Sequence, residues 1–181
     1  MRTNRWTFDT VHSSVAFSVR HLMISRVKGH FDKWSGTLEL DDANPTAAKI
    51  AIRMEAASVN TQDQQRDDHL RSADFFDAGN YPEIAFESTG VKKLSEQNYI
   101  VIGNLTIRGT AKEVPVEVEI LGRARDPWGG FRAGFSANTS IDRRDFGLVF
   151  NVPLEGGGVL VSDKVEISAE LEAVQVVELE A

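Results

Sequence analysis

The side chains that could carry out chemistry are few, because the chain has no cysteine and only four histidines. The lack of cysteine excludes disulfides, thiolate catalysis and cysteine-based metal sites. The histidines are His12, His21, His30 and His69, and the first three are nine residues apart. This spacing matches no known ligand pattern, unlike two histidines one helical turn apart. Hydrogen-bonded structural or surface histidines are therefore the favoured interpretation, and no metal site is predicted.

The densest group of charged side chains surrounds the last histidine. The segment Arg66-Asp67-Asp68-His69-Leu70-Arg71 and the nearby Asp74 contain side chains that can act as general acid and base. His69 with Asp67 or Asp74 could thus serve a small hydrolase or isomerase. The alternative, which we favour, is a solvated helix face on which charges such as Asp67 and Arg71 pair at i and i+4. Because no G-x-S-x-G motif accompanies the segment, we predict no catalytic residues and no enzymatic activity.

Length and charge restrict the class of protein further. The 181 residues, 41% hydrophobic and 26% charged, suit one globular domain over residues 1–181. A net charge of -7, with lysines and arginines scattered along the chain, argues against a nucleic-acid partner. No apolar stretch approaches the length of a transmembrane segment, and nothing like a signal peptide follows Met1. We therefore expect a soluble, cytoplasmic protein.

Alternation of apolar and polar residues is the dominant pattern, and it is typical of antiparallel strands with one wet face. It predicts eight strands, at residues 15–19, 31–40, 50–54, 84–86, 99–107, 114–120, 131–141 and 165–171. Turn-forming residues separate the strands, for example at 126–130 and 156–158. Eight such strands close into a barrel or fold into a sandwich. A barrel of about eight strands has an interior that holds side chains or one ligand.

The segment 61–77 interrupts the alternation. It is polar and lacks proline, and Thr61 can cap a helix whose first turn contains Asp63. We predict one or two short helices here, between the third and fourth strands, covering one end of the barrel.

Phenylalanine dominates the aromatic residues, with ten phenylalanines against two tyrosines. The bias makes the predicted interior apolar, but side chains or a ligand could fill it. A filled barrel would suit a stress-related partner-binding module, and a hollow one would suit an apolar ligand.

Several segments together resemble the YceI-like family of polyisoprenoid-binding, lipocalin-like proteins. The resemblance extends from about Trp6 to Val174, with the motifs in the expected order. They are residues 9–23 (DTVHSSVAFSVRHLM), 27–31 (VKGHF), 69–77 (HLRSADFFD), 81–86 (YPEIAF), 103–110 (GNLTIRGT), 143–148 (RRDFGL) and 161–167 (VSDKVEI).

The resemblance implies a lipocalin-like, eight-stranded antiparallel barrel with a helical insertion. It implies non-enzymatic binding, carriage or storage of a long apolar ligand, such as a polyisoprenoid, an isoprenoid quinone or a fatty acid derivative, with no required cofactor. It also implies a homodimer. Many members carry a secretion signal, and this sequence departs from them in showing none.

Residues of these motifs are the candidate ligand-binding residues. The apolar ones expected to line the cavity are Phe17, Val19, Phe31, Phe76, Phe86, Leu105, Phe135, Phe146 and Leu148. Arg20 and His21 either meet a polar head group or fix the end of the barrel by hydrogen bonds. Arg143 and Asp145 are expected to brace the turn at Phe146-Gly147.

Overall fold

Antiparallel strands make up most of the structure. The computed structural model describes residues 4–176. Its strands are β1 (Asn4–Phe8), β2 (Ser14–His21), β3 (Ser25–Phe31), β4 (Trp34–Leu40), β5 (Lys49–Glu55), β6 (Val59–Asn60), β7 (Glu83–Lys93), β8 (Asn98–Ile107), β9 (Thr110–Arg125), β10 (Phe131–Asp142) and β11 (Val161–Gln175). The helices of this part of the chain are α1 (Gln64–Arg71) and three short 3-10 helices, η1 (Pro45–Ala47), η2 (Ala56–Ser58) and η3 (Arg143–Phe146).

Eight of the strands close into a barrel, which confirms the predicted fold. The order around the ring is β1-β4-β5-β7-β8-β9-β10-β11, and pairing of β1 with β11 completes it. All of these pairings are antiparallel. The long strand β11 also pairs with β2, so β2, β3 and β6 extend the wall beyond the ring. The ring is thus closed by β1, which alternation alone did not predict, and the predicted strand at 15–19 belongs to the extension.

The predicted strand at 31–40 is two strands, because the chain bends between β3 and β4. Ser58 holds the bend: its carbonyl oxygen accepts from Asp32 N–H at 3.0 Å, and its hydroxyl accepts from Lys33 N–H at 3.0 Å. The bend carries the chain from the extension into the ring, where β4 pairs with β1 and β5.

Helix α1 lies between the third and fourth predicted strands, as expected, but its cap differs from the prediction. Asp63 caps it by accepting from Arg66 N–H at 2.9 Å. Thr61 is buried instead, and its hydroxyl donates to Asp67 Oδ1 at 2.6 Å. The predicted pairing of Asp67 with Arg71 is therefore wrong, since Asp67 faces inward.

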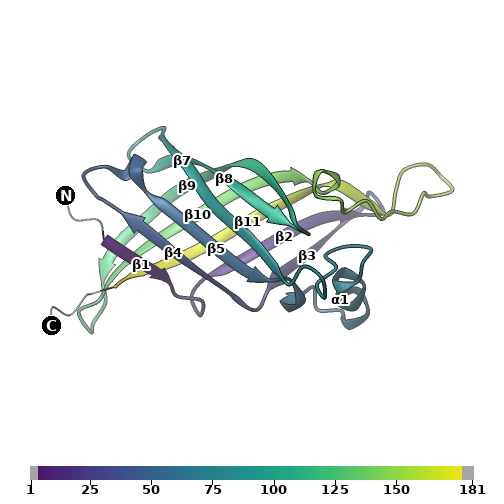
Figure 1. Cartoon of the computed structure of the whole chain (residues 1–181), viewed down its shortest axis with the longest axis horizontal. Coiled ribbons are helices and arrows are strands. Elements are labelled where there is room, and N and C mark those ends of the chain that lie inside the picture. Colours follow the sequence, from purple (N-terminus) through teal and green to yellow (C-terminus); the bar gives the residue numbers. More distant parts are fainter. Residues whose placement is uncertain (1–3, 177–181) are drawn as a thin grey trace.

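The two ends of the barrel differ in what connects the strands (Figure 1). At the helix end lie α1 and the connections at residues 22–24, 56–82, 108–109 and 143–160. At the other end, which we call the hairpin end, lie the connections at 41–48, 94–97 and 126–130, beside the start of β1. No described helix is long and apolar enough to cross a membrane.

Candidate ligand-binding cavity

An apolar cavity of about 820 Å³ runs inside the barrel. The inward positions of the alternating strands form its wall. For example, the apolar lining residues of β9 and β11 include Val114, Val116, Val118, Ile120, Val165, Ile167, Ala169 and Leu171. The lining includes residues of both the helix end and the hairpin end, so the cavity follows the length of the barrel.

The cavity is large enough for a long chain. At about 30 Å³ per water molecule, the volume equals that of about 27 waters. A methylene group is close to water in size, so a chain of some tens of carbon atoms fits. The barrel is not filled by its own side chains, which contradicts the alternative of a filled partner-binding module.

Two of the phenylalanine rings that line the cavity lie over glycines. A Cβ atom on Gly29 would be 2.4 Å from the ring of Phe17, its neighbour across β2 and β3. A Cβ atom on Gly103 would likewise be 2.4 Å from the ring of Phe86. Each glycine therefore leaves the space that its phenylalanine ring occupies against the wall.

All eleven candidate residues line this one cavity. They are Phe17, Val19, Arg20, His21, Phe31, Phe76, Phe86, Leu105, Phe135, Phe146 and Leu148. Most of the lining of β8 to β11 was not among them, although the alternation that predicted those strands also marks their inward faces. The polar lining of the hairpin end was also missed, because the motifs do not extend to it.

At the helix end, His21 borders the cavity from the same face of β2 as Phe17 and Val19, whereas the Arg20 side chain is exposed on the opposite face. Within residues 4–176, neither side chain makes a hydrogen bond or an ion pair, so hydrogen bonds from these two do not fix the barrel end. That task falls to the buried Arg143, which donates to the carbonyl oxygens of Leu148 at 2.5 Å and Ser162 at 3.0 Å.

The predicted brace of the Phe146-Gly147 turn is therefore confirmed for Arg143. Burial lowers the pKa of its guanidinium, and the nearby Asp163 carboxylate opposes this effect. Asp145 is exposed and makes no hydrogen bond to the turn among the described residues, so its part in the brace is not supported.

At the hairpin end, the charged lining residues form pairs. Arg123 Nη1 lies 2.5 Å from Asp42 Oδ1, and this bridge joins β9 to the connection between β4 and β5. Lys93 Nζ lies 2.6 Å from Glu96 Oε1, which raises the pKa of Lys93. The charges of these four residues cancel, so this end offers a ligand no net charge.

Comparisons with known proteins place this barrel in a family. A model of the YceI-like domain matches residues 6–173. The chain belongs to the YceI-like family. The UPF0312 protein of Yersinia pestis (strain Pestoides F) is 40% identical over 165 residues, which are 91% of this chain and 82% of that protein.

Two solved structures share the architecture of this YceI-like barrel. Burkholderia cenocepacia BcnA has a TM-score of 0.79 at 25% identity, covering 91% of this chain and 98% of that one. A domain from Saccharophagus degradans, described as polyisoprenoid binding and implicated in plant cell wall breakdown, has a TM-score of 0.71 at 16% identity. That match covers 94% of this chain and 98% of the domain, and it shows the shared fold.

The candidate acid and base of the YceI-like barrel are only partly brought together. His69 Nε2 lies 2.8 Å from Asp74 Oδ2, whereas Asp67 turns away from His69 to bind Thr61. The His69 ring packs edge-on against Phe150, with 4.8 Å between ring centroids. Within the described residues no hydroxyl group hydrogen-bonds to this ring.

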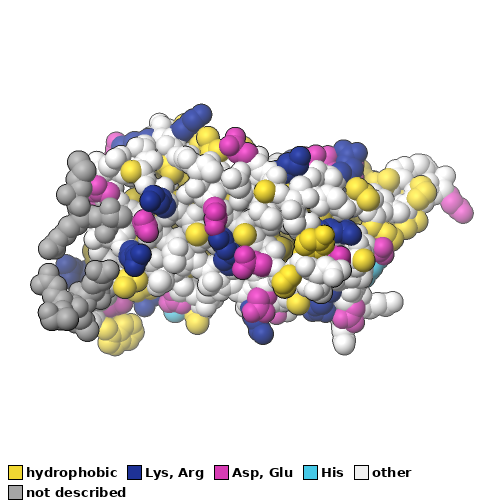
Figure 2. Space-filling model, viewed as in Figure 1, with side chains coloured by type: hydrophobic (Ala, Val, Ile, Leu, Met, Phe, Trp, Pro, Cys, Tyr) yellow, Lys and Arg dark blue, Asp and Glu magenta, His cyan; other side chains and the backbone are white. Residues whose placement is uncertain are grey.

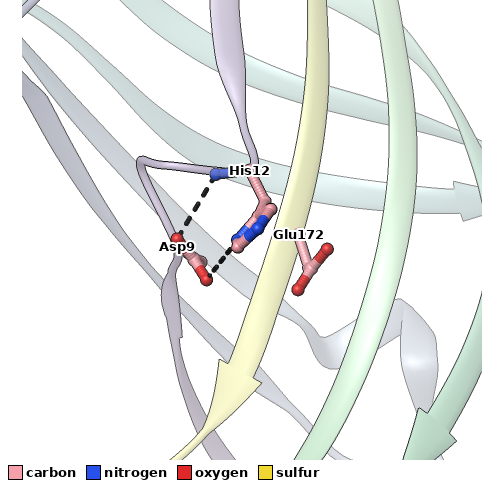
Figure 3. Close-up of side chains that lie close together, drawn as sticks. All are labelled: Asp9, His12 and Glu172. Atoms are coloured by element: carbon pink, nitrogen blue, oxygen red, sulfur yellow. Dashed lines mark hydrogen bonds and ion pairs between the residues drawn. The ribbon is translucent and has the colours of Figure 1, made fainter. Parts of the chain in front are cut away.

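One group of side chains comes together as metal ligands would (Figure 3). Ligand atoms of Asp9, His12 and Glu172 all lie within 4.8 Å of one another. However, Arg132 Nη1 lies 2.9 Å from Asp9 Oδ2 and 2.5 Å from Glu172 Oε1, so a guanidinium already binds one oxygen of each carboxylate. The group is better explained as an ion-pair network that joins the turn after β1 to β10 and β11.

The remaining histidines fit the structural interpretation in part. His12 binds Asp9 and His30 binds Asp32, with 2.9 Å and 2.8 Å between the paired atoms. These contacts, with that of His69, confirm the prediction of hydrogen-bonded histidines. His21 is the exception, because it borders the cavity.

Proposed function

We propose that this protein binds one long apolar molecule inside its barrel and carries or stores it without chemical change. The observation that carries the proposal is the apolar cavity of about 820 Å³ along the barrel. Burial of each methylene group contributes about 0.8 kcal/mol, so a chain of some tens of carbons has a large drive to enter. A polyisoprenoid, an isoprenoid quinone or a fatty acid derivative has the required shape, and the fold shared with a polyisoprenoid binding domain agrees with this choice.

We place the polar end of the ligand at the helix end. There the ring of His21, which makes no hydrogen bond or ion pair among the described residues, borders the cavity. At the hairpin end, Arg123 and Lys93 are already neutralised by carboxylates. A head group that accepts hydrogen bonds therefore finds an unoccupied partner in His21.

Native mass spectrometry and organic extraction of the purified protein test the proposal. We expect one chemically unmodified long-chain molecule per barrel, or its uptake when polyprenols, quinones or fatty acids are supplied to emptied protein. A cavity that stays empty with all three classes of ligand would refute the proposal.

Leu105→Trp should weaken ligand binding roughly tenfold, because overpacking an interior costs about 1–3 kcal/mol. Leu105 is buried on β8 and faces the cavity. The matched control is Leu121→Trp on β9, where the same change is made at an exposed side chain. Equal binding by the two variants, measured by titration with a fluorescent fatty acid, would contradict a ligand site inside the barrel.

Gly29→Ala is a second, milder way to reduce the cavity. The new methyl group would meet only the side chains of Phe17 and Thr61, so the Phe17 ring must move inward while the strands stay in place. We expect reduced capacity for the longest ligands with a retained fold, measured by the chain length of extracted lipid and by circular dichroism.

The homodimer and the cytoplasmic setting stay predictions. Sedimentation velocity of the purified protein measures the first, and fractionation of the source cells measures the second.

A further inference from the structure

Exposed apolar side chains gather at the helix end, where the structure extends beyond the barrel (Figure 2). We call this group the apolar lip: Leu22, Met23 and Ile24 between β2 and β3, with Val149 and Val152 between η3 and β11. Ile24 is 85% exposed and Val149 is 67% exposed. Single exposed apolar residues are ordinary, but several on adjoining connections indicate a contact surface.

The two connections that carry the apolar lip form one surface. Leu22 N–H donates to Leu160 O at 2.9 Å, and Leu160 N–H donates to Val152 O at 2.9 Å. A Cβ atom on Gly158 would lie 3.5 Å from Met23 Cγ. In Figure 1 the connection between η3 and β11, which contains Val152, Gly158 and Leu160, projects past the barrel next to the β2–β3 turn.

The turn at the centre of the apolar lip is strained. Leu22 and Met23 have φ angles of 53° and 62°, in the left-handed region that asparagine and glycine adopt most readily. The Ile24 N–H donates to the His21 carbonyl oxygen at 3.1 Å, and a turn with positive φ at both central residues ordinarily has Asn-Gly there. Leu-Met costs stability in the turn and exposes apolar surface to water.

The apolar lip is continuous with the cavity. His21 precedes the strained turn in the chain, and Leu160 is hydrogen-bonded to it; both line the cavity. An apolar chain that passes between the cavity and the lip therefore stays beside apolar side chains.

We propose that the apolar lip docks on the surface of a lipid bilayer and that the ligand enters and leaves the barrel there. This inference rests on the proposed function, since a long apolar chain is held in bilayers and is nearly insoluble in water. The partner is neutral bilayer surface, because the chain has a net charge of -7 and exposed charges of both signs, Arg26 and Glu155, lie beside the lip. Apolar contact, not charge, drives the docking, so it depends little on salt.

Flotation with phosphatidylcholine vesicles tests the docking. Ile24→Glu should reduce vesicle binding at least about tenfold, because one buried isoleucine side chain contributes a factor of that size. Val11→Glu is the matched control, since Val11 is also 85% exposed. It lies beside Asp9, which is hydrogen-bonded to Glu172, roughly 35 Å along β11 from the lip. This control should bind vesicles as the wild type does.

Transfer measurements separate failure of the docking from failure of the proposed function. Emptied protein is loaded with a polyprenol in two ways, from phosphatidylcholine vesicles and from detergent. Ile24→Glu should reach the wild-type amount from detergent but load about tenfold more slowly from vesicles. A wild type that takes up no polyprenol from detergent would refute the proposed function.

Three outcomes would overturn the docking alone. The first is an Ile24→Glu variant that loads from vesicles at the wild-type rate. The second is loss of vesicle binding in Trp128→Glu instead, because Trp128 is 86% exposed at the hairpin end. The third is a wild-type dimer that does not bind vesicles and that Ile24→Glu converts to monomers, which would make the lip a contact between two copies.

Discussion

The two ends of the barrel both connect neighbouring antiparallel strands, but the turns at the two ends differ in their residues and backbone strain. At the hairpin end the turn at 126–130 has ordinary turn residues: the Asp126 carboxylate accepts from the N–H groups of Trp128 and Gly130, and glycine takes the left-handed position at Gly129. At the helix end, Leu22 and Met23 occupy left-handed positions without such help. One end has turns of low strain, and the other keeps backbone strain beside the cavity.

The charged side chains compared at the two ends also differ in how far they are buried. At the hairpin end the pair of Arg123 and Asp42 is in contact with water, since the Asp42 side chain is 52% exposed. At the helix end the guanidinium of Arg143 is 4% exposed and bonded to backbone carbonyl oxygens. Exposed ion pairs contribute little to stability, whereas loss of one partner from a buried charged network costs several times more. The fold therefore depends more on Arg143 at the helix end than on the exposed pair at the hairpin end.

The largest expected difference between the two ends is in the free energy of unfolding when an arginine is replaced by methionine at each end. Arg143→Met should lower the free energy of unfolding by about 3 kcal/mol, because it leaves buried carbonyl groups without donors. Arg123→Met should lower it by less than about 1 kcal/mol, because an exposed ion pair is lost. Urea unfolding of both variants measures the difference, and equal effects would remove the distinction between the ends.

A smaller effect, of opposite sign, is expected at the strained turn. Replacing Leu22-Met23 by Asn-Gly should raise the free energy of unfolding by about 1–2 kcal/mol, since these residues accept positive φ readily. The same double variant should lose vesicle binding, because it removes two side chains of the apolar lip. Thermal unfolding measures the gain, and a destabilised variant would show that Leu22 and Met23 are needed by the fold itself.

The smallest effect is expected on the side of the barrel, in the network of Asp9, His12 and Arg132. The hydrogen bond to Asp9 raises the pKa of His12 above its ordinary value of 6.5 in the folded protein. Its stabilising contribution is therefore complete below pH 6.5 and is lost as the pH rises through the higher, folded pKa. Asp9 behaves in the opposite way: the hydrogen bond from His12, then that from Arg132, lowers its pKa, so its contribution is lost only in strong acid.

Urea unfolding at pH 6 and pH 8 tests the contribution of His12. The wild type should lose slightly more stability than His12→Gln between these values, because only the wild type releases the His12 proton. The same loss in both proteins would assign the pH dependence to other groups.

Much of the wall was predictable because side-chain alternation is a local property of a strand. The inward faces of β2 and β8, with Phe17, Val19 and Leu105, follow from period two alone. The helix at 64–71 was predictable for the complementary reason, since its segment lacks alternation. Its cap was not, because Thr61 and Asp63 are both good caps, and only the burial of Thr61 against Asp67 selects Asp63.

The sequence by itself therefore determined antiparallel strands with an apolar inner face, since composition and alternation act through each residue's own neighbours, and the resemblance to the YceI-like family selected the barrel over the sandwich. Only the tertiary structure decided that β1 closes the ring, that the rings of Phe17 and Phe86 lie over glycines on neighbouring strands, and that the charged lining residues of the hairpin end form pairs. These features depend on register and on contacts between residues far apart in the chain. A local pattern carries no information about which distant residue lies opposite, and that is why the cavity and its two unlike ends appear only in the folded protein.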